Sequence, residues 1–187
     1  IFPGRVIWSY NPESTDWSGD SGYWWDDMNI DQQEVSSMIS KSIRELTGTS
    51  DDRTAWRKLF EYFNQKKYKQ ATPYQKGETI VIKLNLNNSK TQDDFSSNTV
   101  ICSPQMVYEL LKQLVRKAGV SPQHIIFYDV TRKMSKTIYE SCIQDFPGVR
   151  FIDASNGEGL TETFAVDSGN QIVWSKDLTL EVGGGNP

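Results

Sequence analysis

The 187-residue chain has few of the side chains that most often ligate metals or form nucleophile–base pairs. It contains two cysteines, Cys102 and Cys142, and one histidine, His124. The cysteines lack the spacing of metal ligands, so we predict no iron–sulfur cluster. A single histidine disfavours a histidine-based zinc site and a serine-type catalytic triad. We expect two free thiols, with a disulfide as the alternative if the protein is exported.

The sequence also lacks the features of nucleotide binding, membrane insertion and nucleic-acid binding. No G-x-G-x-x-G motif follows the strand predicted at 78–86, and there is no P-loop, so a dinucleotide-dependent oxidoreductase is disfavoured. The longest apolar runs are far too short to span a bilayer, which predicts no transmembrane segment. The formal net charge of −4 argues against general affinity for nucleic acid or anionic membranes.

The chain does contain enough apolar material for one core. Hydrophobic residues make up 37% of a chain whose length suits a single domain. We assign residues 1–182 to one α/β domain and expect residues 183–187 to form a flexible tail.

The order of the predicted elements is typical of a parallel sheet. Apolar runs predict strands at 4–10, 78–86, 124–129 and 149–154. Amphipathic periodicity predicts helices at 31–48, after Ser50, from Pro104 to Gly119, and at 135–145. The β-α-β-α-β order predicts a three-layer, Rossmann-like, mostly parallel sheet with flanking helices. Residues 161–175 predict a C-terminal β-hairpin.

Two helix starts carry clear capping signals. Asp31 and Glu34 form a D-x-x-E pattern before an apolar stripe, and Gly48 follows the last apolar residue of that helix. Ser103 precedes Pro104, which suits the first position of a helix. We therefore expect these two helices to begin after Asp31 and after Ser103.

Polar residues follow the predicted parallel strands at their carboxyl ends, where such sheets bind ligands. The candidate ligand-binding residues are Lys83, Asn85, Asn87, Asp129 and Arg132. We expect these side chains to converge at one rim of the sheet, where they suit an anionic or polyhydroxylated small molecule, or an oxygen-ligated cation. The alternative is that they are ordinary turn residues, because Asn and Asp readily bond their own backbone.

Lys83 is charged within an otherwise apolar strand. It either marks an exposed strand edge or reaches from the top of the sheet towards an anion.

An acidic, tryptophan-rich loop at 11–31 gives the alternative function. It holds six acidic residues and no Lys or Arg. If its rings are exposed, it forms an extracytoplasmic carbohydrate-binding or interaction module. If they are buried, Trp24 and Trp25 anchor the loop into the core, which a loop of this length needs.

The same loop has a faint likeness to a calcium-binding loop. Asp16, Asp20 and Asp27 occupy first, fifth and twelfth positions, but Ser21 stands where that loop needs a glycine. We therefore predict no metal site and keep these three residues as a weak alternative.

Several segments together resemble a bacterial family, domain of unknown function family 362, and most of all its Bacteroidetes-type branch. They are "PGRVIW", "DWSGDSGYWWDD", "GETIVIKLNLNN", "CSPQMVYELLKQLVRKAGV" and "IIFYDVTR". The residues that match the family pattern are Lys83, Asn85, Pro104, Gly119 and Asp129. The resemblance covers roughly residues 1–155 and implies an α/β fold and an exported, periplasmic or secreted protein. It also implies a second half beyond this chain, and it implies no reaction.

Two functions of different classes follow. The first is an α/β domain with a small-molecule or cation site at the carboxyl ends of the strands, and the second is the module built on loop 11–31. The sequence assigns no catalytic residue, cofactor or oligomeric state.

Overall fold

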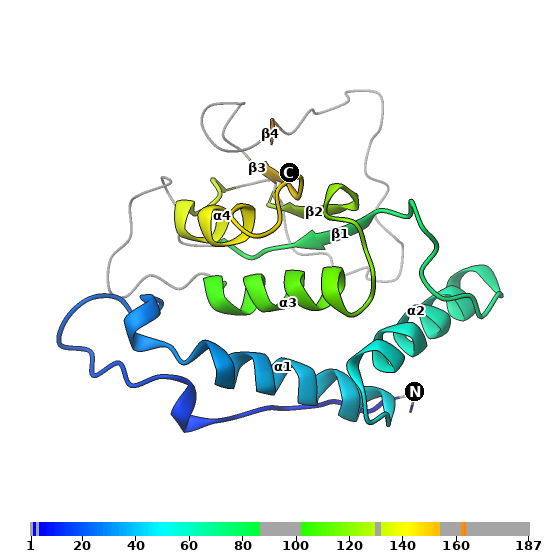
Figure 1. Cartoon of the computed structure of the whole chain (residues 1–187), viewed down its shortest axis with the longest axis horizontal. Helices are drawn as coiled ribbons and strands as arrows, with labels where there is room; N and C mark the ends of the chain where they lie inside the picture. The colour runs from blue at the N-terminus through cyan, green and yellow to red at the C-terminus, as the bar shows by residue number, and fades with distance from the viewer. Residues whose placement is uncertain (1, 3, 87–101, 130–131, 154–161, 164–187) are drawn as a thin grey trace, which may run out of the picture.

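The computed structural model describes residues 2, 4–86, 102–129, 132–153 and 162–163 (Figure 1). The helices are α1 (Gln32–Thr47), α2 (Asp52–Tyr68), α3 (Pro104–Arg116) and α4 (Lys136–Ile143). The strands are β1 (Ile80–Lys83), β2 (Ile125–Tyr128), β3 (Arg150–Asp153) and β4 (Glu162–Thr163). Three short 3-10 helices, η1 (Pro12–Ser14), η2 (Asp27–Asn29) and η3 (Pro122–His124), lie in the connections.

The strands form one parallel sheet in the order β1-β2-β3-β4. Phe127 at the centre of β2 pairs with Ile82 of β1 and with Phe151 of β3. The predictions of a mixed α/β chain and of neighbouring parallel strands near 79–85, 125–129 and 149–153 are therefore confirmed. Strand β1 lies at one edge of the described sheet.

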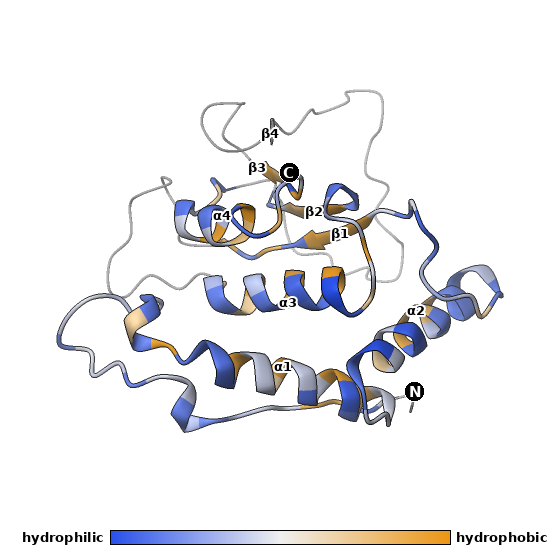
Figure 2. Ribbon diagram, in the orientation of Figure 1, coloured by the Kyte–Doolittle hydropathy of each residue, from blue (hydrophilic) through white to orange (hydrophobic). Residues whose placement is uncertain are grey.

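Helices α3 and α4 connect the strands and pack on the same face of the sheet. The ring of Tyr139 in α4 meets Phe151 edge-on, and Phe127 stacks on Phe151 from the neighbouring strand. Helix α3 packs against α4, and α1 lies on the far side of α3 (Figure 1). Figure 2 shows apolar strands inside these layers and a hydrophilic end of α2. A strand order that follows the chain, with right-handed crossovers, places successive helices on one face.

The core lies between the sheet and this helix layer. Its fully buried members include Leu86, Leu111, Ile125, Phe127, Met134, Ile138 and Cys142. Burial of such side chains contributes about 1.5–3 kcal/mol each relative to exposure. Packing of these side chains sets the distance between the strands and the helices, and so determines where the strand ends lie.

The two capping predictions are confirmed. The Asp31 carboxylate accepts hydrogen bonds from the N–H groups of Gln33 and Glu34, at 2.8 and 3.1 Å. Gly48 ends α1 in the left-handed conformation, with φ +64°. The Ser103 hydroxyl accepts a hydrogen bond from Met106 N–H at the start of α3.

The prediction of a strand at 4–10 is wrong, because the structure has no strand there. The segment runs along α1 (Figure 1), where Arg5 Nη1 donates to the carbonyl of Glu45 at 2.8 Å. Its alternating apolar side chains favour a strand, but a strand also needs a partner, which local sequence does not supply. The predicted hairpin at 161–175 lies outside the described residues except for β4, which pairs parallel to β3.

A buried polar row on α3 joins the helix layers. The row consists of Gln105, Glu109 and Gln113, four residues apart on one helix face. Gln105 donates a hydrogen bond to the Trp25 carbonyl at 2.7 Å. Glu109 accepts one from the Ser36 hydroxyl at 2.8 Å, and Gln113 accepts one from Trp56 Nε1 at 3.1 Å. Each buried polar group thus has a partner, and the row fixes loop 11–31, α1 and α2 onto α3.

Candidate functional site

The carboxyl ends of β2 and β3 each carry a buried aspartate. Asp129 is 2% exposed and Asp153 is fully buried. The Asp129 Oδ2 atom accepts a hydrogen bond from Leu86 N–H at 3.1 Å, and an Asp153 oxygen accepts one from Met134 N–H. Each carboxylate therefore binds the backbone of the segment that leaves the preceding strand.

Lys83 and Asn85 lie together at the end of β1. The Lys83 ammonium donates to Asn85 Oδ1 at 2.7 Å and to the Leu84 carbonyl at 3.2 Å. Both residues are exposed, whereas Leu84 between them is buried. Of the two positions predicted for Lys83, the described sheet therefore shows the exposed strand edge.

The structure does not bring all the predicted site residues together. Lys83 pairs with Tyr128 in the register, so it points to the opposite face of the sheet from the next residue, Asp129. The expected convergence of Lys83 with Asp129 on one face is thus corrected, because side chains alternate along strands. Arg132 is exposed, and no hydrogen bond or ion pair joins it to another described residue. Asn87 lies outside the described residues.

A cavity of about 550 Å³ opens beside the end of β1. It is lined mainly by apolar side chains of α1, α3 and β1, with Trp56 from α2. The apolar members include Met38, Ile39, Ile43, Ile82, Met106 and Leu110. Its polar members are few: Lys83, Cys102 and three serines. A mostly apolar cavity of this size with few polar groups is the usual form of a small-molecule site.

The amino-terminal end of α3 also borders this cavity. Ser103, Met106 and Val107 of its first turn line the wall. Lys83 is also among the residues that border the cavity, so a lysine and the positive end of a helix dipole both adjoin an apolar cavity. Both favour a negatively charged group.

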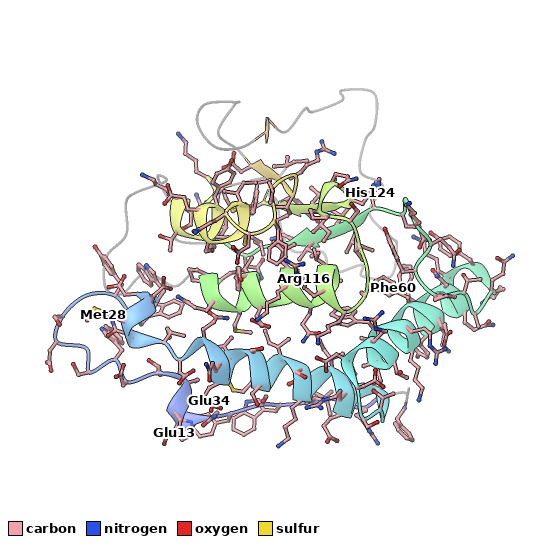
Figure 3. The ribbon with its side chains drawn as sticks, viewed as in Figure 1. Glu13, Met28, Glu34, Phe60, Arg116 and His124 are labelled. Atoms are coloured by element: carbon pink, nitrogen blue, oxygen red, sulfur yellow. The ribbon has the colours of Figure 1, made fainter. Side chains whose placement is uncertain are left out.

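The rings of loop 11–31 are mainly structural. Trp25 is 3% exposed, and the ring of Tyr23 stacks on it with centroids 4.7 Å apart. Trp24 is half-buried against the core and meets Trp25 edge-on. The interpretation of Trp24 and Trp25 as anchors is supported by these contacts. Met28 of η2, which is labelled in Figure 3, is 84% exposed.

The acidic side chains of this loop have structural contacts as well. Asp27 Oδ1 accepts a hydrogen bond from Gln105 Nε2 at 3.0 Å, and Asp26 Oδ2 accepts one from Tyr23 N–H at 2.7 Å. Asp16 and Asp20 are exposed. Within the part of the chain that the structure describes, no three His, Cys, Asp or Glu side chains are grouped to hold a metal ion.

Both cysteines are free thiols. Cys102 lines the cavity, and its Sγ lies 3.2 Å from the Asn85 backbone nitrogen. Cys142 is buried in the core, where desolvation raises the pKa of its thiol to about 12. A thiol with such a pKa stays protonated and unreactive at neutral pH.

The cavity could not be found from the sequence. Its lining comes from segments far apart in the chain, from Ser9 and Val35 to Leu110, and each apolar lining residue alone reads as an ordinary core residue. The only signal in the sequence was the charge of Lys83 within an apolar strand.

Comparisons with known proteins add no relative. The chain matches no protein-family model, no curated protein and no solved structure. None of the described helices combines the length and apolar character that crossing a bilayer demands.

Proposed function

We propose that the chain is a ligand-binding α/β domain that takes a small amphipathic anion at the carboxyl end of β1. The observation that carries this proposal is an apolar cavity of about 550 Å³ that Lys83 and the start of α3 both border. Of the ligand classes that the sequence left open, an anion fits best, because both of these groups are positive.

The apolar body of the ligand would lie among the side chains of α1 and α3. Met38, Ile39 and Leu110 offer it no hydrogen-bonding side chain, so a polyhydroxylated molecule would leave its hydroxyl groups without partners here. A hydrocarbon chain or an aromatic ring instead gains about 25 cal/mol for each Å² of apolar surface that it buries.

The anionic head group would lie at Lys83. The ammonium already donates to Asn85 Oδ1 and the Leu84 carbonyl, which holds it in place and leaves one of its three donors for the ligand. Asn85 thus positions Lys83. Charge-assisted hydrogen bonds of this kind contribute about 1.5–3 kcal/mol.

Titration with laurate, a twelve-carbon carboxylate, tests the proposal. We expect saturable binding that changes tryptophan fluorescence, because Trp56 lines the cavity. Lys83→Met should weaken binding at least about tenfold, since 1.4 kcal/mol corresponds to a factor of ten. The matched control is Lys41→Met, which removes an exposed lysine of α1 outside the cavity lining.

Dodecanol has the same chain and no charge, and should bind more weakly than laurate to the native protein. The proposal is wrong if laurate shows no saturation, if the two lysine variants bind it equally, or if dodecanol binds as well as laurate.

We also propose membership of domain of unknown function family 362, an exported protein and a Rossmann-like arrangement completed by a C-terminal hairpin. The motif around Lys83, Asn85 and Asp129 supports the membership, and the parallel sheet supports the arrangement. An experimental structure of the full-length protein tests both the arrangement and the hairpin.

A further inference from the structure

Among the residues that the structure describes, the backbone groups on the outer edge of β1 have no strand partner. Leu84 N–H donates to the Tyr128 carbonyl at 2.8 Å, so Leu84 and, by alternation, Ile82 point their backbone groups towards β2. Val81 and Lys83 must then point their N–H and C=O groups outward. No strand among the described residues pairs with this side of β1. Unpaired strand edges are templates for the addition of another strand.

An apolar hollow runs along the same edge. Besides the cavity at the end of β1, a second one of about 640 Å³ lies between α2 and residues 78–81. It is lined by Phe60, Phe63 and other aromatic residues of α2. Trp56 borders both cavities, so they adjoin, and every residue from 79 to 84 borders one or the other. Alternate side chains of an added strand, those that face the helices, would therefore find apolar space beside this edge.

The same chain carries a segment with the properties of such a strand. Residues 5–10 read "RVIWSY", with β-branched and aromatic side chains at alternate positions. Val6, Trp8 and Tyr10 are 87%, 81% and 69% exposed, and the rings of Trp8 and Tyr10 stack at 5.6 Å. The backbone of residues 6–10 makes no backbone hydrogen bond within the described part of the chain.

This segment turns its large side chains away from its own core. Arg5 holds it to the carbonyl of Glu45, and Asn11 donates to Glu34 Oε2 at 2.7 Å, so it lies along α1. Ser9, on its other side, faces the cavity. The ridge formed by Val6, Trp8 and Tyr10 is thus exposed on the surface of the molecule.

We propose that the segment at 5–10 of one copy adds as a strand to the outer edge of β1 in a second copy. In this mode of recognition the main-chain hydrogen bonds supply affinity, and pockets for alternate side chains supply specificity. Trp and Tyr are the side chains that most often dominate interface energies. Each chain has one such segment and one such edge, so two copies can exchange strands reciprocally in a closed dimer.

One double variant in the ridge and two single variants at the edge separate the two halves of this contact. Trp8→Ser combined with Tyr10→Ser removes the ridge and leaves β1 intact. Val81→Pro removes an outward N–H and leaves the ladder to β2, which uses Ile82 and Leu84. Val81→Glu is a second edge variant, because it places a charge at the apolar hollow without changing the backbone. Met28→Ser is the control for the loss of an exposed apolar side chain elsewhere.

Light scattering after size exclusion measures the mass of each variant over a range of concentrations. The native chain and Met28→Ser should rise from the 21.3 kDa monomer towards twice that mass. The ridge variant and both edge variants should remain monomers with native circular dichroism. An equimolar mixture of the ridge variant and an edge variant should form a heterodimer through the one contact that remains intact, and this heterodimer should be weaker than the native dimer because it has one contact in place of two.

The proposal is overturned if the native chain stays at 21.3 kDa at every concentration. It is equally overturned if the ridge or edge variants dimerise like the native chain, or if the mixture dimerises as tightly as the native chain. Laurate binding by the monomeric variants is a separate measurement, so failure of the strand exchange leaves the ligand proposal standing.

Discussion

Single residues at the strand ends have roles that their chemistry alone does not reveal. Asp129 and Lys83 are both polar residues that end apolar strands, yet one is buried and the other is exposed. The buried Asp129 carboxylate accepts a hydrogen bond from Leu86 N–H, and the exposed Lys83 borders a cavity. Which of the two roles a residue takes depends on the face of the sheet on which it lies.

Replacement of Asp129 tests its structural role. Asp129→Ala leaves the Leu86 N–H without its acceptor, and an unsatisfied buried donor costs about 1–3 kcal/mol of unfolding free energy. Asp129→Asn keeps an acceptor oxygen and should cost less. Urea denaturation measures both values, and an equal loss in the two variants would contradict a role as hydrogen-bond acceptor.

Helix caps and the parallel order of the strands could be predicted, whereas the fate of the segment at 4–10 and the strand register could not. The caps of α1 and α3 are set within a few residues by Asp31 and Ser103, and both were predicted. The segment at 4–10 has the composition of a strand, but its pairing depends on another part of a sheet. The opposite directions of Lys83 and Asp129 likewise follow from a register between two strands that the sequence does not state.

The long loop at 11–31 shows how one ring can fix an element. Trp25 is buried and its carbonyl accepts a hydrogen bond from Gln105, so Trp25→Ala should lower the unfolding free energy by about 3–5 kcal/mol. Met28→Ala is the matched control in the same loop, because loss of an 84% exposed side chain should cost no more than about 0.5 kcal/mol. Thermal or urea unfolding gives both values, and similar losses at the two positions would refute the anchor.

At the scale of the whole molecule, the helices form layers on one side of the sheet. Helices α3 and α4 cover one face, and the polar row of α3 ties α1 and α2 to them. The apolar cavity lies where α1, α2, α3 and the sheet edge meet, so it exists only when all of these are assembled. Stability of the assembled fold and availability of the proposed site are therefore linked.

That assembled core makes stability depend on pH through Cys142. Burial raises the pKa of its thiol from 9.0 to about 12, so the folded state holds the proton more tightly than the unfolded state. The stabilisation is complete below pH 9 and is lost as the pH rises towards 12. At pH 10.5 the unfolded thiol is ionised and the folded thiol is not, which lowers the unfolding free energy by about 2 kcal/mol, from 1.36 kcal/mol per pH unit.

Urea denaturation of the native chain and Cys142→Ala at pH 7.5 and 10.5 isolates this contribution from the other groups that titrate. The alanine variant is less stable at pH 7.5, because it leaves a small cavity beside Ile138 and Phe151 in the core. The difference in unfolding free energy between the two proteins should be about 2 kcal/mol smaller at pH 10.5 than at pH 7.5, since only the native chain carries the Cys142 thiol. A difference that stays constant between the two pH values would mean that Cys142 is accessible to solvent and that the core around it is not closed.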